Sequence, residues 1–181
     1  MNQVFQYTSA AVSDVGRVRS LNEDAYLSRP DLGLWVVADG MGGHDAGDVA
    51  SGMIVERLDK LQAPESARSF LNNVTGLLQG VNDELRQRAK AQGDNCVIGS
   101  TVVAFLVYGR HYACVWAGDS RIYRLHRGRL QRLTRDHSYV QELIDRGNLS
   151  PEEAASHPQA NVITRAVGRL RTCSWKMNMR N

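Results

Sequence analysis

The chain of 181 residues is 43% hydrophobic and 23% charged, which is the composition of a globular protein that fills one domain. Its formal net charge of +3 is small, no block of basic residues occurs, and no apolar stretch approaches the roughly 20 residues that cross a bilayer, so we expect neither a nucleic-acid nor a membrane partner. Three cysteines without a CxxC pair, and an N-terminus without a secretory signal, favour a soluble cytoplasmic protein with no zinc site and no disulfide framework. We also expect a monomer.

The first half of the chain is predicted to contain short strands followed by two helices. Alternation of apolar and polar residues predicts strands near residues 3–13, 25–28 and 34–38. From Gly47 the apolar residues take helical spacing, and a second helix is predicted from about Ala67 to Ala91.

The second half is predicted to be rich in strands. Residues 99–108 are almost wholly apolar, 111–118 follow, and 121–133 alternate around a turn at Arg127–Gly128. Helical features return after Asp136, and Ser150 with Pro151 has the form of a helix start. Strands in hairpin order, without strict β-α-β alternation, predict an α+β fold with a mainly antiparallel sheet.

Common catalytic motifs are missing. The sequence has no GxxxxGK[ST] for a P-loop, no GxSxG for a nucleophilic serine and no HExxH for zinc, and GMGG does not match GxGxxG. What remains are aspartates beside glycines at the ends of predicted strands: Asp39 before GMGG, Asp119 in AGDSR and Asp24 at the end of RSLNED. Carboxylate and carbonyl oxygens are the ligands that Mg²⁺ and Mn²⁺ prefer, and a glycine lets them approach without a Cβ in the way.

Each of these motifs has a simpler interpretation when taken alone. An aspartate before a glycine, as at Asp39 or Asp119, is typical of a turn. Glu23 and Asp24 are also typical of a solvated strand end, and Arg19 of a surface ion pair. No single motif therefore decides between a site and ordinary structure.

The order of the motifs along the chain resembles one family, the bacterial metal-dependent serine/threonine phosphatases of the PP2C type. The resemblance runs from about Asp14 to Gly168 and is carried by RSLNED, VVADGMGGHDAG, GSTVV, AGDSRIYR, LTRDHSYVQELIDRG and NVITRAVG. It implies an α-β-β-α sandwich of antiparallel sheets flanked by helices, with metal ions in a cleft at one end.

The resemblance also implies a set of metal ligands. Asp39 corresponds to the aspartate that bridges two metal ions, and the backbone carbonyl of Gly40 to a ligand of one of them. Asp119 corresponds to a third, weaker metal position. The implied cofactors are Mn²⁺ or Mg²⁺, with two to three ions in the intact family site.

Other residues acquire roles from the same resemblance. Glu23 and Asp24 correspond to residues that orient metal-bound water, and Arg19 to the residue that binds the substrate phosphate. His44 and His137 are candidates for proton transfer to the leaving alkoxide, and packing of the glycine loop is an equally good interpretation of His44.

The implied activity is hydrolysis of phosphoserine and phosphothreonine in proteins by a metal-activated water. The partners would be phosphorylated proteins, including a bacterial serine/threonine kinase and its substrates. The alternative is a catalytically impaired phosphatase-like module that binds phosphoproteins.

The match to the family pattern ends after Gly168. The family continues there through a second D-G motif and a G-x-D-N segment whose aspartates complete the metal pair, whereas this chain reads RLRTCSWKMNMRN without a helical or strand period. Our hypothesis is a change of reading frame near Gly168, because another frame through Trp175–Met179 gives acidic residues. It divides the chain into an incomplete phosphatase domain (1–168) and an aberrant tail (169–181). We expect this polypeptide to be poorly stable and weakly active, and its full-length parent to be active.

Overall fold

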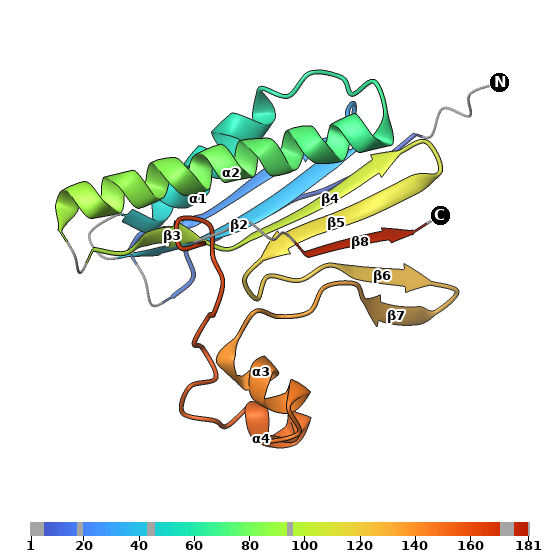
Figure 1. Cartoon of the computed structure of the whole chain (residues 1–181). Coiled ribbons are helices and arrows are strands. Elements are labelled where there is room, and N and C mark those ends of the chain that lie inside the picture. Colours follow the sequence, from blue (N-terminus) through green and yellow to red (C-terminus); the bar gives the residue numbers. More distant parts are fainter. Residues whose placement is uncertain (1–5, 18–19, 43–45, 94–95, 171–175, 181) are drawn as a thin grey trace.

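The computed structural model describes residues 6–17, 20–42, 46–93, 96–170 and, for the backbone alone, 176–180 (Figure 1). In chain order its elements are β1 (Asp24–Arg29), β2 (Leu34–Gly42), α1 (Ala46–Asp59), α2 (Ala67–Gln92), β3 (Ile98–Ser100), β4 (Val102–Tyr108), β5 (His111–Ala117), β6 (Tyr123–His126), β7 (Arg129–Arg132), α3 (Tyr139–Asp145), α4 (Pro151–Ala154) and β8 (Lys176–Arg180). The predicted α+β class with antiparallel sheets is confirmed.

The main sheet has the strand order β1-β2-β4-β5-β8, with β3 paired to β2, and every pairing in it is antiparallel. The predicted strands at 25–28 and 34–38 correspond to β1 and β2, and β2 extends four residues further than predicted. The stretch predicted as one strand over 99–108 is divided at Thr101 into β3 and β4.

The prediction of a strand over 3–13 is wrong for the residues of that stretch that the structure describes, since residues 6–13 form none. This segment has little apolar surface to bury, and Val12 is 91% exposed. Its contacts with the sheet are made by single side chains: the ring of Tyr7 meets Trp35 edge-on at 5.3 Å, and the hydroxyls of Ser9 and Ser28 lie 2.9 Å apart.

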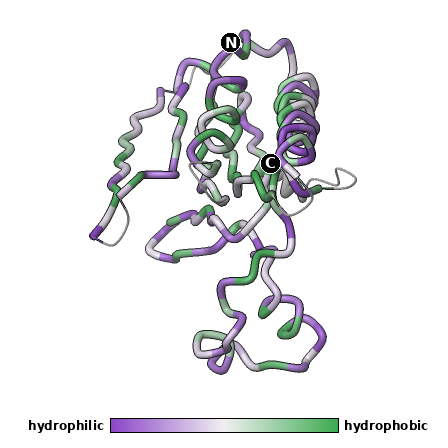
Figure 2. The backbone as a smooth tube through the Cα atoms, turned by 90° about the vertical axis from the view of Figure 1, so that its left-hand side faces the viewer, coloured by the Kyte–Doolittle hydropathy of each residue, from purple (hydrophilic) through white to green (hydrophobic). Residues whose placement is uncertain are grey.

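Helices α1 and α2 cover one face of the main sheet (Figure 1). Hydrophobic and hydrophilic residues recur along helix α2 (Figure 2). Its buried residues are spaced three or four apart, so they lie on one side of the helix, which packs on the sheet. Ser66 begins it with a capping box, in which the Ser66 hydroxyl accepts a hydrogen bond from the backbone of Ser69. Between helices and sheet lies the main core, which includes Leu34, Val36, Ile54, Leu58, Phe70, Val74, Leu78, Leu85, Val102 and Val115.

The other face of the sheet carries a smaller cluster, formed by Val103, Cys114, Trp116 and Leu133. Half-buried aromatic rings continue it across three strands, with Phe105 6.0 Å from Trp35 and 5.7 Å from Tyr112. Burial raises the pKa of the Cys114 thiol to about 11.

The predicted hairpin at 121–133 is confirmed as strands β6 and β7. Arg127 and Gly128 both have positive φ, 48° and 75°, which is the backbone of a tight two-residue turn between twisted strands. Helices α3 and α4 follow and extend away from the sheet in both views (Figures 1 and 2). The predicted helix start is also confirmed, because the Ser150 hydroxyl accepts from the Glu153 amide and Glu153 accepts from the Ser150 amide.

Residues 166–170 return to the main core. The amides of Gly168 and Leu170 both donate to the side-chain oxygen of Asn82, at 2.9 and 3.2 Å, and the Asn82 amide donates to the carbonyl of Leu170 at 3.1 Å. Leu170 is buried in the same core. Strand β8 then pairs with β5 although its sequence has no strand period, because backbone pairing needs no side-chain pattern.

Among the helices that the structure describes, none is long and apolar enough to span a membrane.

Candidate functional site

Two predicted site residues face each other at the end of β2. The antiparallel register places Asp24 of β1 directly opposite Asp39 of β2. Burial alternates along β2, and Asp39 belongs to the exposed set, on the face away from the helices. Residues in such positions have Cβ atoms about 4.5–5.5 Å apart, and two like charges there repel each other. A cation bound between the carboxylates would remove that repulsion.

Gly40 lies in a position where no side chain fits. A Cβ at Gly40 would come within 2.0 Å of the carbonyl oxygen of Gly47 in α1 and 2.7 Å of the carbonyl oxygen of Glu23. The Gly40 amide donates to that Glu23 carbonyl at 3.0 Å. The glycine therefore allows the first turn of α1 to pack directly against the end of β2.

Glu23, which precedes β1, lies beside the first turn of α1. Its carboxylate fills the space next to Gly47, where a Cβ would come within 2.2 Å of Oε1. Its backbone carbonyl accepts a second hydrogen bond, from the hydroxyl of Ser51 at 2.6 Å. A carboxylate near the N-terminus of a helix interacts favourably with the helix dipole. This explains why an acidic residue is accommodated beside α1.

The backbone of Asp39 is held on both sides by the motif GST. Its carbonyl accepts from the Thr101 amide at 2.8 Å and from the Ser100 hydroxyl at 3.0 Å. Its amide donates to the hydroxyl of Thr101 at 3.2 Å. Both Ser100 and Thr101 are fully buried. The position of Asp39 is thus fixed by hydrogen bonds that do not involve its carboxylate.

Asp119 lies in the loop that follows β5. Next to it, the hydroxyl of Ser120 is 2.7 Å from that of Thr101. On the other side, the Gly118 amide donates to Nδ1 of His137 at 3.2 Å, and the His137 amide donates to the Gly118 carbonyl at 2.9 Å. The imidazole of His137 also stacks on Trp116, with the ring centroids 6.0 Å apart. His137 therefore fixes the loop that carries Asp119.

The donor in the Gly118–His137 hydrogen bond is a backbone amide, so Nδ1 of His137 accepts and carries no proton. The predicted role of His137 in proton transfer stays a prediction.

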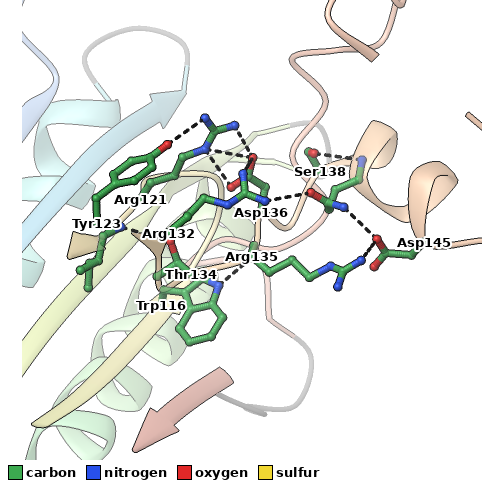
Figure 3. A network of polar contacts seen from close by, with 11 residues as sticks. Trp116, Arg121, Tyr123, Arg132, Thr134, Arg135, Asp136, Ser138 and Asp145 are labelled. Atoms are coloured by element: carbon green, nitrogen blue, oxygen red, sulfur yellow. Dashed lines mark hydrogen bonds and ion pairs between the residues drawn. The ribbon is translucent and has the colours of Figure 1, made fainter. Parts of the chain in front are cut away.

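A network of charged side chains lies beside the Asp119 loop (Figure 3). Arg121 forms three hydrogen bonds to the buried carboxylate of Asp136, at 3.0 and 3.1 Å from Nε and 2.5 Å from Nη2. Arg132 lies 3.5 Å from the same carboxylate. Arg135 pairs with Asp145 of α3, and its carbonyl accepts from the indole of Trp116 at 2.8 Å. These contacts join the hairpin, the loop and α3.

A cavity of about 560 Å³ opens between this network and the two short helices. Asp119, Arg121 and Asp136 line one side of it, and apolar residues of α3 and α4 line the other. Asp119 thus faces a space that is large enough for part of a peptide.

The donors at the end of β2 are of the type that Mn²⁺ and Mg²⁺ bind, namely carboxylates and a backbone carbonyl. Within the ranges that the structure describes, however, no three histidine, cysteine, aspartate or glutamate side chains converge closely enough to hold a metal ion. The donor type fits a hard divalent cation, and the protein ligands are few.

Arg19 and His44 lie outside the described residues. The structure adds Thr101, Ser100 and Gly47 to the predicted set. In the sequence, GST is one motif among several, and its signal is the pair of hydroxyl residues inside an otherwise apolar stretch.

Comparison with known proteins identifies the family. A family model described as Protein phosphatase 2C matches residues 16–174. The serine/threonine protein phosphatase PstP of Mycobacterium tuberculosis is 39% identical over 158 residues, which cover 87% of this chain and 30% of PstP. The serine/threonine phosphatase stp of Listeria monocytogenes is 37% identical over 166 residues, covering 86% of this chain and 65% of that protein. The chain therefore spans less than two thirds of the length of these curated relatives.

Solved structures agree with this identification. PppA, described as a key regulatory component of T6SS in Pseudomonas aeruginosa, superposes with a TM-score of 0.84 and 46% identity over 93% of this chain and 69% of that one. The catalytic domain of PstP, solved in complex with two manganese ions, gives a TM-score of 0.80 at 34% identity over 94% of this chain and 70% of that one. Because the family model covers most of the chain and these relatives share its sequence and fold, the chain belongs to the protein phosphatase 2C family.

Proposed function

We propose that the site around Asp39 serves the hydrolysis of phosphoserine and phosphothreonine in proteins, with Mn²⁺ or Mg²⁺ as cofactor. The observation that carries the proposal is the opposition of Asp24 and Asp39 on the exposed face of the sheet, next to the crowded Gly40. Family membership and the two manganese ions in the PstP structure support it.

In this proposal each residue has a separate task. Asp39 and the Gly40 carbonyl hold the cation, Asp119 contributes a further, weaker position, and Glu23 and Asp24 orient water. When bound, the metal lowers the pKa of a coordinated water and neutralises charge on the phosphoryl oxygens.

Arg19 would bind the phosphate of the substrate through its planar guanidinium, and His44 or His137 would donate a proton to the leaving alkoxide. The water oxygen forms a bond to phosphorus while the bond from phosphorus to the serine or threonine oxygen breaks. The products are inorganic phosphate and the free hydroxyl.

The substrates would be phosphorylated proteins, including a bacterial kinase and its targets. The apolar and charged lining of the cavity beside Asp119 supports a peptide rather than a small phosphate ester as ligand.

A second candidate is a module that binds phosphoproteins without turning them over. It is favoured by the small number of metal ligands that converge in the part of the chain the structure describes. We expect the isolated chain to bind Mn²⁺ weakly and to hydrolyse phosphopeptides slowly, because each ligand that is lost removes a donor and a compensating charge.

The test uses the purified chain and a phosphothreonine peptide. Mn²⁺ binding is measured by electron paramagnetic resonance and phosphate release by a colorimetric assay. The matched variants are Asp39→Asn and Asp31→Asn, which make the same chemical change at opposite ends of the β1–β2 hairpin.

We expect weak Mn²⁺ binding in the wild type and in Asp31→Asn, and none in Asp39→Asn. Equal Mn²⁺ binding by all three proteins would overturn the proposed site. Rapid Mn²⁺-dependent hydrolysis that disappears in Asp39→Asn would overturn only the expectation of low activity, and tight peptide binding without phosphate release would favour the binding module.

The division of the chain at Gly168 is also a proposal. The coding DNA tests it: a single-base change near that codon should open a longer frame with a D-G and a G-x-D-N segment, and the lack of such a frame would contradict it.

A further inference from the structure

Thr101 connects strand β2, which carries Asp39, with the loop that carries Asp119. Its hydroxyl accepts a hydrogen bond from the Asp39 amide at 3.2 Å and lies 2.7 Å from the hydroxyl of Ser120, the residue after Asp119. One hydroxyl can accept from an amide and donate its own proton at the same time. A single oxygen atom therefore links both predicted ligand positions.

The sheet register explains how Thr101 reaches both sides. On β2, Gly40 pairs with Ser100 of β3 and Val37 with Val103 of β4, so Thr101, between these two strands, lies opposite Asp39 and donates its amide to the Asp39 carbonyl. In β5, Ala117 pairs with Val102, so Gly118 lies opposite Thr101 on the other side. Thr101 thus lies between β3 and β4, with the end of β2 on one side and the residue after β5 on the other.

The site around Thr101 is closely packed. Thr101 is fully buried, and a Cβ at Gly118 would come within 2.6 Å of the Thr101 Cβ. Gly118 has a φ of 110°, a backbone conformation that residues with side chains rarely adopt. The loop after β5 can therefore lie against Thr101 only because residue 118 has no side chain.

We propose that Thr101 is a positioning residue, whose hydroxyl fixes the Asp119 loop relative to Asp39 and so sets the geometry of the cation site. This inference rests on the proposed function, since it takes Asp39 and Asp119 as the metal ligands. Residues that orient metal ligands through hydrogen bonds change metal affinity by about 10- to 100-fold when they are mutated.

The test compares three variants of the full chain. Thr101→Val keeps the shape of the side chain and removes the hydroxyl, Thr101→Ser keeps the hydroxyl and removes the methyl group, and Ser120→Ala breaks only the link to the loop. For each protein, Mn²⁺ affinity is measured by electron paramagnetic resonance. Exchange of the Asp39 and Ser120 amides is measured by NMR, with the buried α2 amides of Val74 and Leu78 as the control for global folding.

We expect Thr101→Val to weaken Mn²⁺ binding about tenfold and to speed exchange at Asp39 while α2 is unchanged. Thr101→Ser should restore both quantities, and Ser120→Ala should weaken Mn²⁺ binding while the Asp39 amide stays protected. Wild-type behaviour in Thr101→Val, or equal losses in Thr101→Val and Thr101→Ser, would overturn the inference.

The two proposals can fail separately. If the wild-type chain shows no Mn²⁺ binding that depends on Asp39, the proposed metal site fails. Amide exchange then decides on Thr101 alone: faster exchange at Asp39 in Thr101→Val with recovery in Thr101→Ser supports its positioning role, and unchanged exchange overturns it.

Discussion

The two faces of the main sheet are built differently. The face under α1 and α2 is made of fully buried aliphatic and aromatic side chains in one continuous core. Among the described residues, the opposite face has a small buried cluster, half-buried aromatic rings and, at its end, the exposed pair Asp24 and Asp39. The first face holds the fold together, and the second carries the groups that chemistry needs. Such a separation allows repulsive charges to persist at a site because the stability comes from elsewhere.

Two matched phenylalanine substitutions should give the largest difference in stability between the two faces. Phe70 of α2 is 1% exposed in the core, whereas Phe105 of β4 is half-buried on the other face. Phe70→Ala should lower the free energy of unfolding by about 3–5 kcal/mol, because it leaves a cavity in a closely packed core. Phe105→Ala should cost clearly less. Urea denaturation of both variants measures this, and equal losses would contradict the difference between the faces.

The next largest effect is expected at Asn82, a buried polar residue of α2. Asn82→Ala would leave the buried amides of Gly168 and Leu170 without their acceptor. We expect a loss of about 2 kcal/mol or more, since each of the two unsatisfied buried amides costs at least about 1 kcal/mol. Asn73→Ala, at an exposed position of the same helix, is the control and should have little effect. A neutral Asn82→Ala would show that residues 168–170 do not contribute to the core.

A smaller effect of opposite sign is expected on the other face. Asp24→Asn removes one of two like charges in directly opposed positions, so without divalent ions it should raise the free energy of unfolding by about 0.2–1 kcal/mol. Asp31→Asn, which breaks an exposed ion pair with Arg29, should not stabilise the chain. The gain from Asp24→Asn should shrink in about 1 M salt, where surface charges are screened. A loss of stability in Asp24→Asn would contradict the interpretation.

The smallest effect is expected far from both faces, in α4. Hydrogen bonds from the backbone and hydroxyl of Ser150 lower the pKa of Glu153, so the carboxylate stabilises this turn above its unfolded pKa. That stabilisation should be lost as the pH falls through the lowered folded pKa. Hydrogen exchange of residues 150–154 should therefore show more local opening at acid than at neutral pH, whereas Glu153→Gln should open at both. A pH-independent opening equilibrium in the wild type would contradict this role of Glu153.

Most elements followed from the sequence because their signals are local. The spacing of apolar residues predicts α2, and Ser150 with Pro151 predicts the start of α4 within one residue. The strand predicted over 3–13 is wrong for the described residues 6–13, because alternation alone does not provide apolar surface to bury. The division of residues 98–108 at Thr101 depends on partners that are distant in the chain.

The sequence indicates which residues of the candidate site are of the metal-binding type, and it does not indicate the hydrogen bonds that hold them in place. Resemblance to the family pointed to Asp39, Gly40 and Asp119. The role of Thr101 was not predictable, because its two partners are 62 and 19 residues away and meet only in the folded sheet. The same holds for Asn82, whose partners lie 86 and 88 residues further along the chain.

The register between β1 and β2 determines how a correctly folded preparation can be recognised. A shift of one residue would turn the side chains of one strand to the opposite face, so Asp24 and Asp39 would no longer meet. Such a molecule could keep its strand and helix content and still lack the pair of oxygen donors. Circular dichroism, which measures secondary-structure content, would not distinguish such a molecule from the native one. Cation titration would, because only molecules with the correct register bind the cation.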